Sequence, residues 1–402
     1  QRFVCRRGGF CRGPRASQRA LQELGKSSLL VRISGEVKNF SWGSKHLIQD
    51  HLGLGSTNQA VAEVWFGTHD GGQSKLISSG KNLSEAIGSK LSFLVKFLAA
   101  ESPLSIQVHP NALQAKAGFA KENAAGIDLT GPKRNYKDDS HKPEILIALS
   151  AFEALCGFRP RAEILEIFLA FSETEARFGE LAALAATDAS LEEIFGELLE
   201  DGQLARRFAS SVAGLDSDSI SEQARGLVVD LLDKYPGDTG ALVSLLLNFV
   251  RLAPGEAIYL PAGNLHAYLS GLGLEVMAAS DNVIRGGLTS KHIDKAELRE
   301  ITDFSELAKP VVATKKLAEG LVEYPVSASE FRVYRAQISG SNLLADIDLP
   351  AAALVVCVSG EIAVGTSQEQ REVLKKGEVV FVSEAKKFSL SGSGDAFVVL
   401  GS

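Results

Sequence analysis

Four side chains in three short motifs have the chemistry of a divalent metal site. They are Gln107, His109, Glu144 and His266. Two imidazoles, one carboxylate and one amide make a set of nitrogen and oxygen ligands that suits a catalytic divalent metal and leaves room for substrate or water. The sequence therefore predicts one metal centre, with these four residues as its ligands.

The segment 254–266 predicts how the last of these ligands is positioned. It reads as a strand, a sharp turn and a histidine that starts the returning strand. Gly255 and Gly263 supply backbone freedom, and Pro261 fixes φ between them. The spacing G-x5-P-x-G-x2-H resembles the second metal-binding motif of the cupin β-barrels, which delivers one imidazole into the mouth of a small barrel.

The other candidate ligands are weaker when each is taken alone. Gln107 and His109 can share one face of a strand, because side chains at i and i+2 point the same way. An isolated Q-x-H pair is nevertheless more often a satisfied histidine of the core or surface, and a lone Glu144 would ordinarily be solvated. The metal site is favoured because four candidates converge on one predicted barrel.

Length and composition restrict the class of protein. At 402 residues the chain is too long for one ordinary core, so two or three domains are expected. A hydrophobic content of 45% and a charged content of 23% are typical of a globular protein, and no apolar run is long enough to span a bilayer. The net charge of -7 argues against nucleic acid or an acidic membrane as partner, although a local basic pocket could still bind an anion.

The cysteines and the first thirty residues bear on location. Cys5, Cys11, Cys156 and Cys357 form no dense framework, so a reducing cytoplasm is expected. Residues 1–30 carry seven basic side chains against one acidic one and have no apolar core of a secretory signal. We interpret them as a disordered or misassigned extension without a folded role; the alternative is an organellar transit peptide.

The pattern along the chain predicts a mainly β protein with an inserted α-helical domain and two jelly-roll barrels of the cupin type. Strand-like runs fill residues 31–160 and 250–316, which we assign to one catalytic barrel. Residues 161–249 have apolar residues at three- and four-residue spacing and form the helical insertion. Residues 317–402 are again β-rich and form a C-terminal barrel. The active site is expected in the mouth of the first barrel, under the helices.

A weak internal repeat predicts that the C-terminal barrel has no metal. The run 377–382 mirrors 255–260 at an offset of 122, and at that offset Phe388 takes the place of His266. An apolar side chain there would fill the barrel as ordinary core. One metal per chain is therefore expected.

Longer motifs strongly resemble those of type I mannose-6-phosphate isomerases. The resemblance covers about residues 37–310 well and the C-terminal barrel loosely. The motifs that carry it are WGS (42–44), AEVWFGTH (62–69), LSIQVHP (104–110), HKPE (141–144), FEALCGFRP (152–160), LPAGNLHAYL (260–269) and SDNVIRGGLT (280–289). Two positions depart from the expected pattern, Val108 and Ser270, and neither removes a ligand.

The resemblance implies a zinc enzyme that interconverts mannose 6-phosphate and fructose 6-phosphate. It implies the same four ligands as the residues do, and it places the active-site arginine at Arg285 and the lysine of the HKPE motif at Lys142. The expected partner is a sugar phosphate, and the chain is expected to be a monomer. Two rival hypotheses are an inactive metal-binding cupin that senses sugar phosphates and a metal-dependent oxygenase. The first leaves Arg285 and Lys142 unexplained, and the second favours a two-histidine, one-carboxylate iron set.

The implied reaction moves a proton between C1 and C2 through a cis-enediol(ate), so it needs a base, an oxyanion stabiliser and a phosphate clamp. Arg285 can stabilise the enediolate or hold phosphate through its planar fork. Glu275 lies among apolar neighbours and could be a base of raised pKa or the partner of a buried arginine. Four further residues are candidate substrate contacts, and each has a structural alternative. Lys96 could be a charge at a strand edge, Ser105 a turn cap, Lys291 a solvated lysine and Tyr268 part of the barrel lining.

Overall fold

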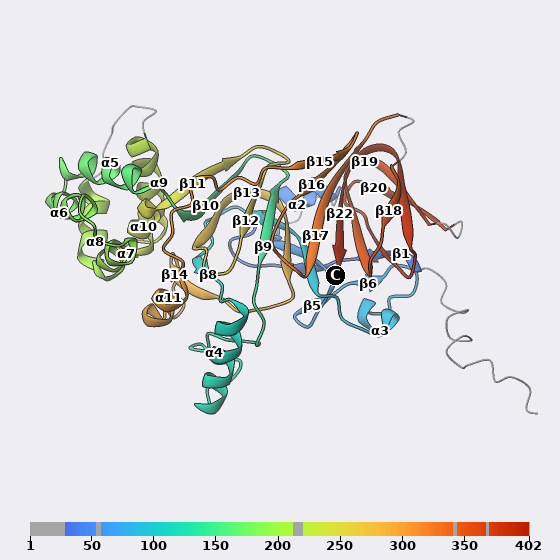
Figure 1. Ribbon diagram of the computed structural model, residues 1–402, viewed down its shortest axis with the longest axis horizontal. Helices are drawn as coiled ribbons and strands as arrows, with labels where there is room; N and C mark the ends of the chain where they lie inside the picture. Colours follow the sequence, from blue (N-terminus) through green and yellow to red (C-terminus); the bar gives the residue numbers. More distant parts are fainter. Residues whose placement is uncertain (1–28, 54–57, 212–219, 341–343, 367–369, 402) are drawn as a thin grey trace, which may run out of the picture.

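Figure 1 shows the computed structural model, which describes residues 29–53, 58–211, 220–340, 344–366 and 370–401. Helices gather at one end of the long axis, and two antiparallel ten-stranded sheets follow towards the other end. The predicted fold class, mainly β with a helical insertion, is confirmed.

The first sheet forms the catalytic barrel. Its strands are β2 (Glu36–Lys38), β3 (Glu63–Phe66), β7 (Phe93–Ala100), β8 (Ile106–Val108), β9 (Glu144–Ala148), β10 (Phe152–Phe158), β11 (Leu247–Leu252), β12 (Ala257–Leu260), β13 (His266–Ala278) and β14 (Ile284–Gly287). The order is β11-β10-β13-β7-β3-β2, while β12 pairs with β9 and β14 pairs with β8. All these pairs are antiparallel, as hairpin-rich barrels require.

Strand β13 holds the two faces of this barrel together. Its first residues pair with β10 and β8, and its later residues pair with β7 and β9. The change of partners occurs near Gly271, whose φ of 117° is unfavourable for any residue with a Cβ. A Cβ there would lie 2.5 Å from the carbonyl oxygen of Ala151, so glycine is required on steric grounds as well.

The helical insertion lies between β10 and β11. It comprises α5 (Arg161–Ser172), α6 (Ala176–Ala185), α7 (Leu191–Glu200), α8 (Gly202–Ser211), α9 (Ile220–Lys234), α10 (Gly240–Val243) and the 3₁₀ turn η1 (Ser244–Leu246). The apolar spacing that predicts these helices also predicts their buried faces, because Ile164, Ile167 and Phe168 share one core with Ile194 and Phe195. Ser190 and Glu193 form a capping box that begins α7.

In the described ranges, four further helices connect strands of the barrels. They are α2 (Leu47–Leu52), α3 (Leu83–Ile87), α4 (Ala112–Ala124) and α11 (Lys295–Ile301), and the short hairpin β4 (Thr68–His69) and β5 (Gly72–Gln73) lies near α3 in sequence. Helix α4 projects from the body of the molecule (Figure 1). Asn111, two residues after the candidate ligand His109, caps it by accepting from the backbone of Gln114.

The second sheet forms the C-terminal barrel. Its strands are β1 (Leu29–Ser34), β6 (Lys75–Leu76), β15 (Lys315–Ala318), β16 (Leu321–Tyr324), β17 (Phe331–Ile338), β18 (Leu344–Asp348), β19 (Ala352–Thr366), β20 (Arg371–Lys375), β21 (Val379–Ser383) and β22 (Lys387–Gly401). Phe388 is buried in its core, where an apolar side chain is expected.

The N-terminal strand differs from the predicted division of the chain. We assign residues from 31 onwards to the catalytic barrel, but β1 pairs with β21 of the C-terminal sheet, and β6 pairs with β1. A strand joins the sheet whose edge it can complete, and a local pattern of apolar residues does not identify that sheet. Of the extension 1–30, residues 1–28 lie outside the described residues, and Leu29 and Leu30 begin β1.

The two barrels share one apolar core. Val95 and Phe97 of the catalytic barrel belong to the same buried cluster as Phe331, Val333 and Phe381 of the C-terminal barrel. Such a contact buries both surfaces from water, so each barrel stabilises the other.

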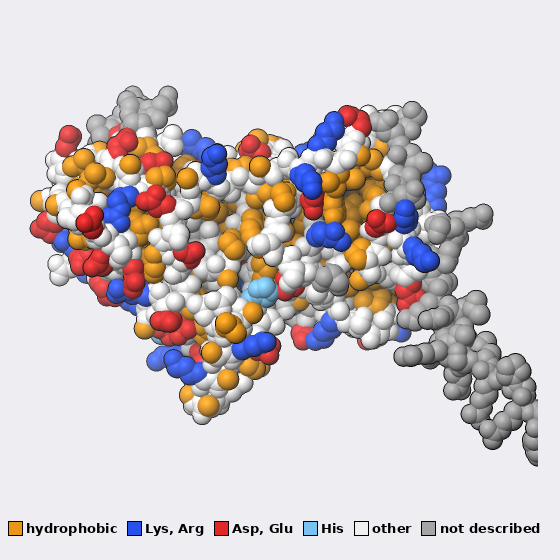
Figure 2. All heavy atoms as spheres, viewed as in Figure 1, with side chains coloured by type: hydrophobic (Ala, Val, Ile, Leu, Met, Phe, Trp, Pro, Cys, Tyr) orange, Lys and Arg blue, Asp and Glu red, His pale blue; other side chains and the backbone are white. Residues whose placement is uncertain are grey.

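The surface agrees with the sequence composition. Acidic and basic side chains are interspersed on the face seen in Figure 2, which fits the small net charge. None of the helices in the described ranges is long and apolar enough to cross a membrane.

Candidate metal centre and active site

Three of the predicted ligands meet inside the catalytic barrel. His109 directly follows β8, Glu144 begins β9 and His266 begins β13. The Oε2 atom of Glu144 lies 3.3 Å from Nε2 of His109 and 3.5 Å from Nε2 of His266. All three side chains are buried, and their ligand atoms lie within 4.8 Å of one another. Three strand ends from distant parts of the sequence therefore deliver one cluster.

In the described structure, these three ligand atoms make no hydrogen bond. Nε2 of His109, Oε2 of Glu144 and Nε2 of His266 are buried without a hydrogen-bond partner. Leaving such atoms unsatisfied costs about 1–3 kcal/mol each. Burial lowers the pKa of His109 to about 4, so the imidazole is neutral and offers a lone pair. A divalent cation would satisfy all three atoms at once, and the cluster fits one.

The backbone holds both imidazoles in the matching tautomer. Nδ1 of His109 lies 2.7 Å from the carbonyl oxygen of Asn282, and Nδ1 of His266 lies 2.9 Å from the carbonyl oxygen of Asn264. A carbonyl can only accept, so each Nδ1 carries the proton and donates it. Each Nε2 is then left free to bind a metal.

Gln107 lies beside this cluster. It pairs across the sheet with His266 on one side and with Arg285 on the other. Its side chain lines the same cavity as Glu144. The amide is thus available to a metal held by the two histidines and the glutamate.

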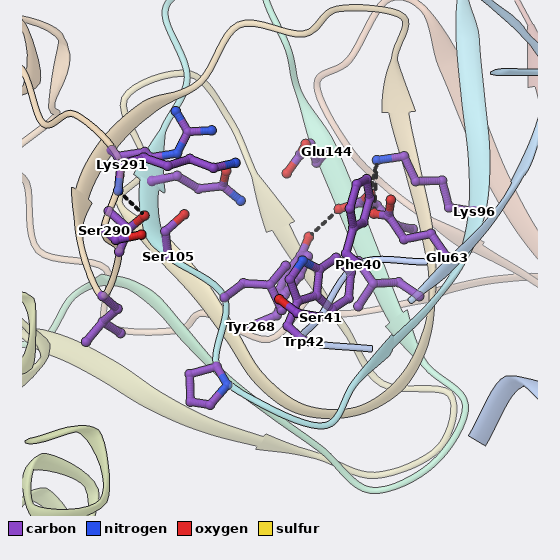
Figure 3. Close-up of a pocket in the computed structure, with 18 of the residues that line it drawn as sticks. Phe40, Ser41, Trp42, Glu63, Lys96, Ser105, Glu144, Tyr268, Ser290 and Lys291 are labelled. Carbon is purple, nitrogen blue, oxygen red and sulfur yellow. Dashed lines mark hydrogen bonds and ion pairs between the residues drawn. The ribbon is translucent and has the colours of Figure 1, made fainter. Parts of the chain in front are cut away.

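The cluster opens into a cavity of about 450 Å³. Figure 3 shows Lys291, Ser290 and Ser105 at one end, Lys96 and Glu63 at the other, and Glu144 between them. The lining also includes Phe40, Ser41, Trp42, Leu98, Pro103, Leu104, Gln107, Lys142, Tyr235, Tyr268, Glu275, Arg285, Leu288 and Thr289. All the predicted substrate and catalytic residues therefore reach this one cavity.

One end of the cavity carries unpaired positive charge. Within the described residues, Arg285 and Lys291 have no carboxylate within ion-pair distance of their side chains, and both line the cavity. Ser105 lies at the same end as Lys291 (Figure 3). Burial lowers the pKa of Arg285, and burial together with Arg285 lowers the pKa of Lys291. Arg285 belongs to strand β14. Pairing of β14 with β8 holds the backbone from which Arg285 reaches the cavity.

The other end contains a buried ionic network. Nζ of Lys96 lies 2.7 Å from Oε2 of Glu275 and 3.6 Å from Oε1 of Glu63. Tyr268 donates to Oε1 of Glu275 at 2.9 Å. Glu275 is thus paired with a lysine, where the sequence suggested either a base or the partner of an arginine. Burial raises the pKa of Glu275 against the opposing charge of Lys96.

Lys142 connects the metal cluster to the cavity wall. Its Nζ lies 2.8 Å from Oε1 of Glu144, so one carboxylate oxygen faces the lysine and the other faces the histidines. Burial alone would raise the pKa of Glu144, but the charge of Lys142 holds it well below its usual value. The glutamate is therefore ionised, as a metal ligand must be.

Sequence reasoning did not nominate several residues of this cavity. Glu63 is one, although a carboxylate in the apolar strand AEVWF was a usable signal. Phe40 stacks on Trp42 with ring centroids 5.7 Å apart at the cavity wall. Tyr235 reaches the cavity from the helical insertion, and its hydroxyl donates to the carbonyl of Pro103. Nothing in the local sequence around Tyr235 indicates this contact.

Comparison with known proteins identifies close relatives. Residues 30–161 match the family model of the phosphomannose isomerase type I catalytic domain. The chain is 35% identical to the mannose-6-phosphate isomerase of Salmonella typhimurium over 91% of this chain and 98% of that protein. It is 36% identical to the mannose-6-phosphate isomerase of Escherichia coli over 88% of this chain and 95% of that one.

Solved structures agree with these matches. A mutant of the phosphomannose isomerase from Salmonella typhimurium superimposes with a TM-score of 0.83 at 33% identity, and the match covers 92% of this chain and 99% of that one. A zinc-bound mannose 6-phosphate isomerase superimposes with a TM-score of 0.82, with the same identity and coverage. The similarity therefore extends through both barrels and the helical insertion.

Proposed function

This chain belongs to the type I phosphomannose isomerase family, and from that premise we propose how its residues interconvert mannose 6-phosphate and fructose 6-phosphate. The chain is an aldose–ketose isomerase with a zinc site. The observation that carries the residue assignment is the set of three buried, unsatisfied ligand atoms at a cavity whose far end holds two unpaired cations.

We assign the zinc to His109, Glu144 and His266, with Gln107 as the fourth ligand. The orphaned Nε2 and Oε2 atoms support the first three, and the place of Gln107 between His266 and Arg285 supports the fourth. Zinc bound there would supply Lewis acidity towards the oxygens at C1 and C2 of the sugar. One zinc per chain is expected.

We assign the phosphate to the cationic end of the cavity. Arg285 and Lys291 offer charge without a competing carboxylate, and Ser105 offers a hydroxyl. A guanidinium can bind a phosphate or an enediolate through two parallel hydrogen bonds, so Arg285 can serve either role. A phosphate at this end directs C1 and C2 towards the metal cluster.

We assign proton transfer to the network at the other end. The reaction removes a proton from C2 of the aldose, passes through a cis-enediolate and returns a proton to C1, while a hydroxyl proton crosses between the two oxygens. Glu275 is the candidate base, because its pKa is raised and its carboxylate lines the cavity. Lys96 and Tyr268 hold its two oxygens. Lys142 completes the set by keeping Glu144 ionised.

Zinc analysis combined with a coupled isomerase assay tests these assignments. We expect one zinc per chain and turnover of mannose 6-phosphate that disappears on chelation and returns with zinc. Two tightly held ions per chain would contradict the single site. Zinc without turnover would support an inactive sensor instead.

We also propose that the active unit is a monomer in the cytoplasm. A single chain supplies the metal cluster and both ends of the cavity, so the site can form without a second copy, which supports the monomer. Cys156 and Cys357 are free and buried, which is compatible with a reducing compartment. Light scattering after size-exclusion chromatography tests the first, and the distribution of the labelled protein in cells tests the second.

A further inference from the structure

The short loop 279–283, between β13 and β14, contacts the metal cluster at His109. Asn282 lies in this loop and is fully buried. Its carbonyl oxygen accepts the hydrogen bond from Nδ1 of His109 at 2.7 Å. Whatever fixes this carbonyl therefore fixes the tautomer and the ring orientation of a metal ligand.

The side chain of Asn282 is saturated with backbone hydrogen bonds. Its Oδ1 accepts from the amides of Lys137 at 2.7 Å and Asp138 at 3.2 Å. Its Nδ2 donates to the carbonyls of Asp138 at 2.9 Å and Ser140 at 2.8 Å. The amide thus holds the segment 137–140, which leads directly into the HKPE motif and Glu144.

Asp138 returns these contacts from the other side. Its Oδ1 accepts from the hydroxyl of Ser280 at 2.8 Å, and its Oδ2 accepts from the amide of Asp281 at 2.9 Å. The hydroxyl of Ser280 in turn lies 3.3 Å from the amide of Asn282. The two loops are joined by side chains of both, and Ser280 and Asn282 are the buried members of this network.

The network lies between functional segments and holds them in one geometry. One loop leads into Glu144, and the other contains the carbonyl that orients His109 and continues three residues later to Arg285. Because the network also contacts the imidazole of His109, its role extends beyond joining two loops.

We propose that Asn282 and Asp138 are positioning residues that set the zinc affinity by orienting His109. The proposal rests on the assignment of the metal to His109, Glu144 and His266. Losing a partner that orients a metal ligand typically costs about 10- to 100-fold in metal affinity. The same loosening reaches Arg285 through the backbone, so turnover should fall even when zinc is saturating.

The test is a zinc titration of the metal-free protein against a competing chelator. Asn282→Ala should weaken zinc binding about 10-fold or more. Asn282→Asp keeps the size but replaces two donors by an acceptor that faces the carbonyls of Asp138 and Ser140, so its zinc affinity should fall at least as far. If neither variant folds, Asp138→Asn preserves the volume and one acceptor oxygen and should show a smaller loss in the same direction.

A control separates positioning from simple destabilisation. Val382→Ala removes buried core of the C-terminal barrel, away from the metal cluster. It should lower the melting temperature of the metal-free protein and leave the zinc dissociation constant unchanged. Asn282 variants that melt earlier but bind zinc as tightly as the unmodified chain would overturn the proposal. If the unmodified chain itself binds no zinc, the metal assignment fails and the positioning proposal fails with it; zinc binding without isomerase activity would contradict the proposed function alone.

Discussion

At the scale of single residues, the charges of the cavity are divided into paired and unpaired groups. Lys96 and Lys142 each face a carboxylate within 2.8 Å, whereas no carboxylate in the described residues pairs with Arg285. A buried charge that has no protein partner is costly, and a substrate anion would compensate that cost. Replacing Arg285, the unpaired group, should therefore impair catalysis without unfolding the protein.

Arg285→Lys should reduce turnover about 100-fold or more, since losing one transition-state contact costs about 3 kcal/mol. The lysine keeps the charge and loses the planar fork. The melting temperature and zinc content should change little, because Arg285 has no carboxylate to leave unpaired. Parallel measurement of turnover, zinc content and thermal unfolding checks this. Near-normal turnover, or loss of the fold without a separate kinetic defect, would count against the catalytic assignment.

His266→Ala should abolish zinc binding or weaken it severely. It removes one of the buried ligands and leaves Glu144 with a single imidazole partner. Zinc content after dialysis measures the effect, and Phe388→Ala is the matched control, because that position lies in the C-terminal core. Wild-type zinc occupancy in His266→Ala would place the metal elsewhere.

At the scale of elements, the segment 238–240 of the helical insertion contacts the segment 287–289, next to the cationic end of the cavity. Asp238 accepts from the amide of Thr289 at 3.1 Å, and Gly240 packs against Gly287 with no room for a side chain. A Cβ on Gly240 would lie 2.7 Å from the Cα of Gly287. The segment that carries Lys291 therefore rests on the helical insertion.

Gly240→Ala should push the insertion away from this segment. We expect a raised KM for mannose 6-phosphate, a smaller change in kcat and an unchanged zinc affinity, because the metal ligands lie on other strands. Gly226→Ala is the control: nothing lies within 4 Å of its Cβ position on α9, so it should stabilise the protein by about 0.5–1 kcal/mol and leave KM unchanged. An unchanged KM in Gly240→Ala would show that the insertion does not support the substrate site.

At the scale of the whole molecule, the N-terminal strand β1 belongs to the C-terminal sheet. Leu30 and Ile33 are buried, and the strand pairs with β21 on one side and with β6 on the other. The C-terminal barrel shares its core with the catalytic barrel, so damage to β1 should reach the active site through that core.

A chain that begins at Leu29 should keep its activity, whereas one that begins at Gly35 should lose stability and solubility. The second deletion removes β1 and uncovers an edge of β21. Thermal unfolding followed together with zinc release measures the difference. Equal stability of the two truncated chains would show that β1 contributes nothing, and inactivity of the first would show that residues 1–28 have a role.

The sequence by itself determined the fold class and the family. Periodicity of two or of 3.6 residues is local, so it separates the strands from the helical insertion, and the motif around His266 depends on a turn whose glycines and proline are adjacent in sequence. Gln107, His109, Glu144 and His266 could be nominated for the same reason, because each stands in a short motif.

Only the tertiary structure decided which side chains are partners. Glu275 faces Lys96, 179 residues away, Asn282 supports His109 from a loop 173 residues away, and β1 belongs to the C-terminal sheet. These contacts arise when distant strands close into a barrel and bring their ends together. Neither propensity nor pattern contains that information, because many pairings of the same strands would bury the same apolar faces, and only side-chain packing and hydrogen-bond satisfaction across the closed barrel select one.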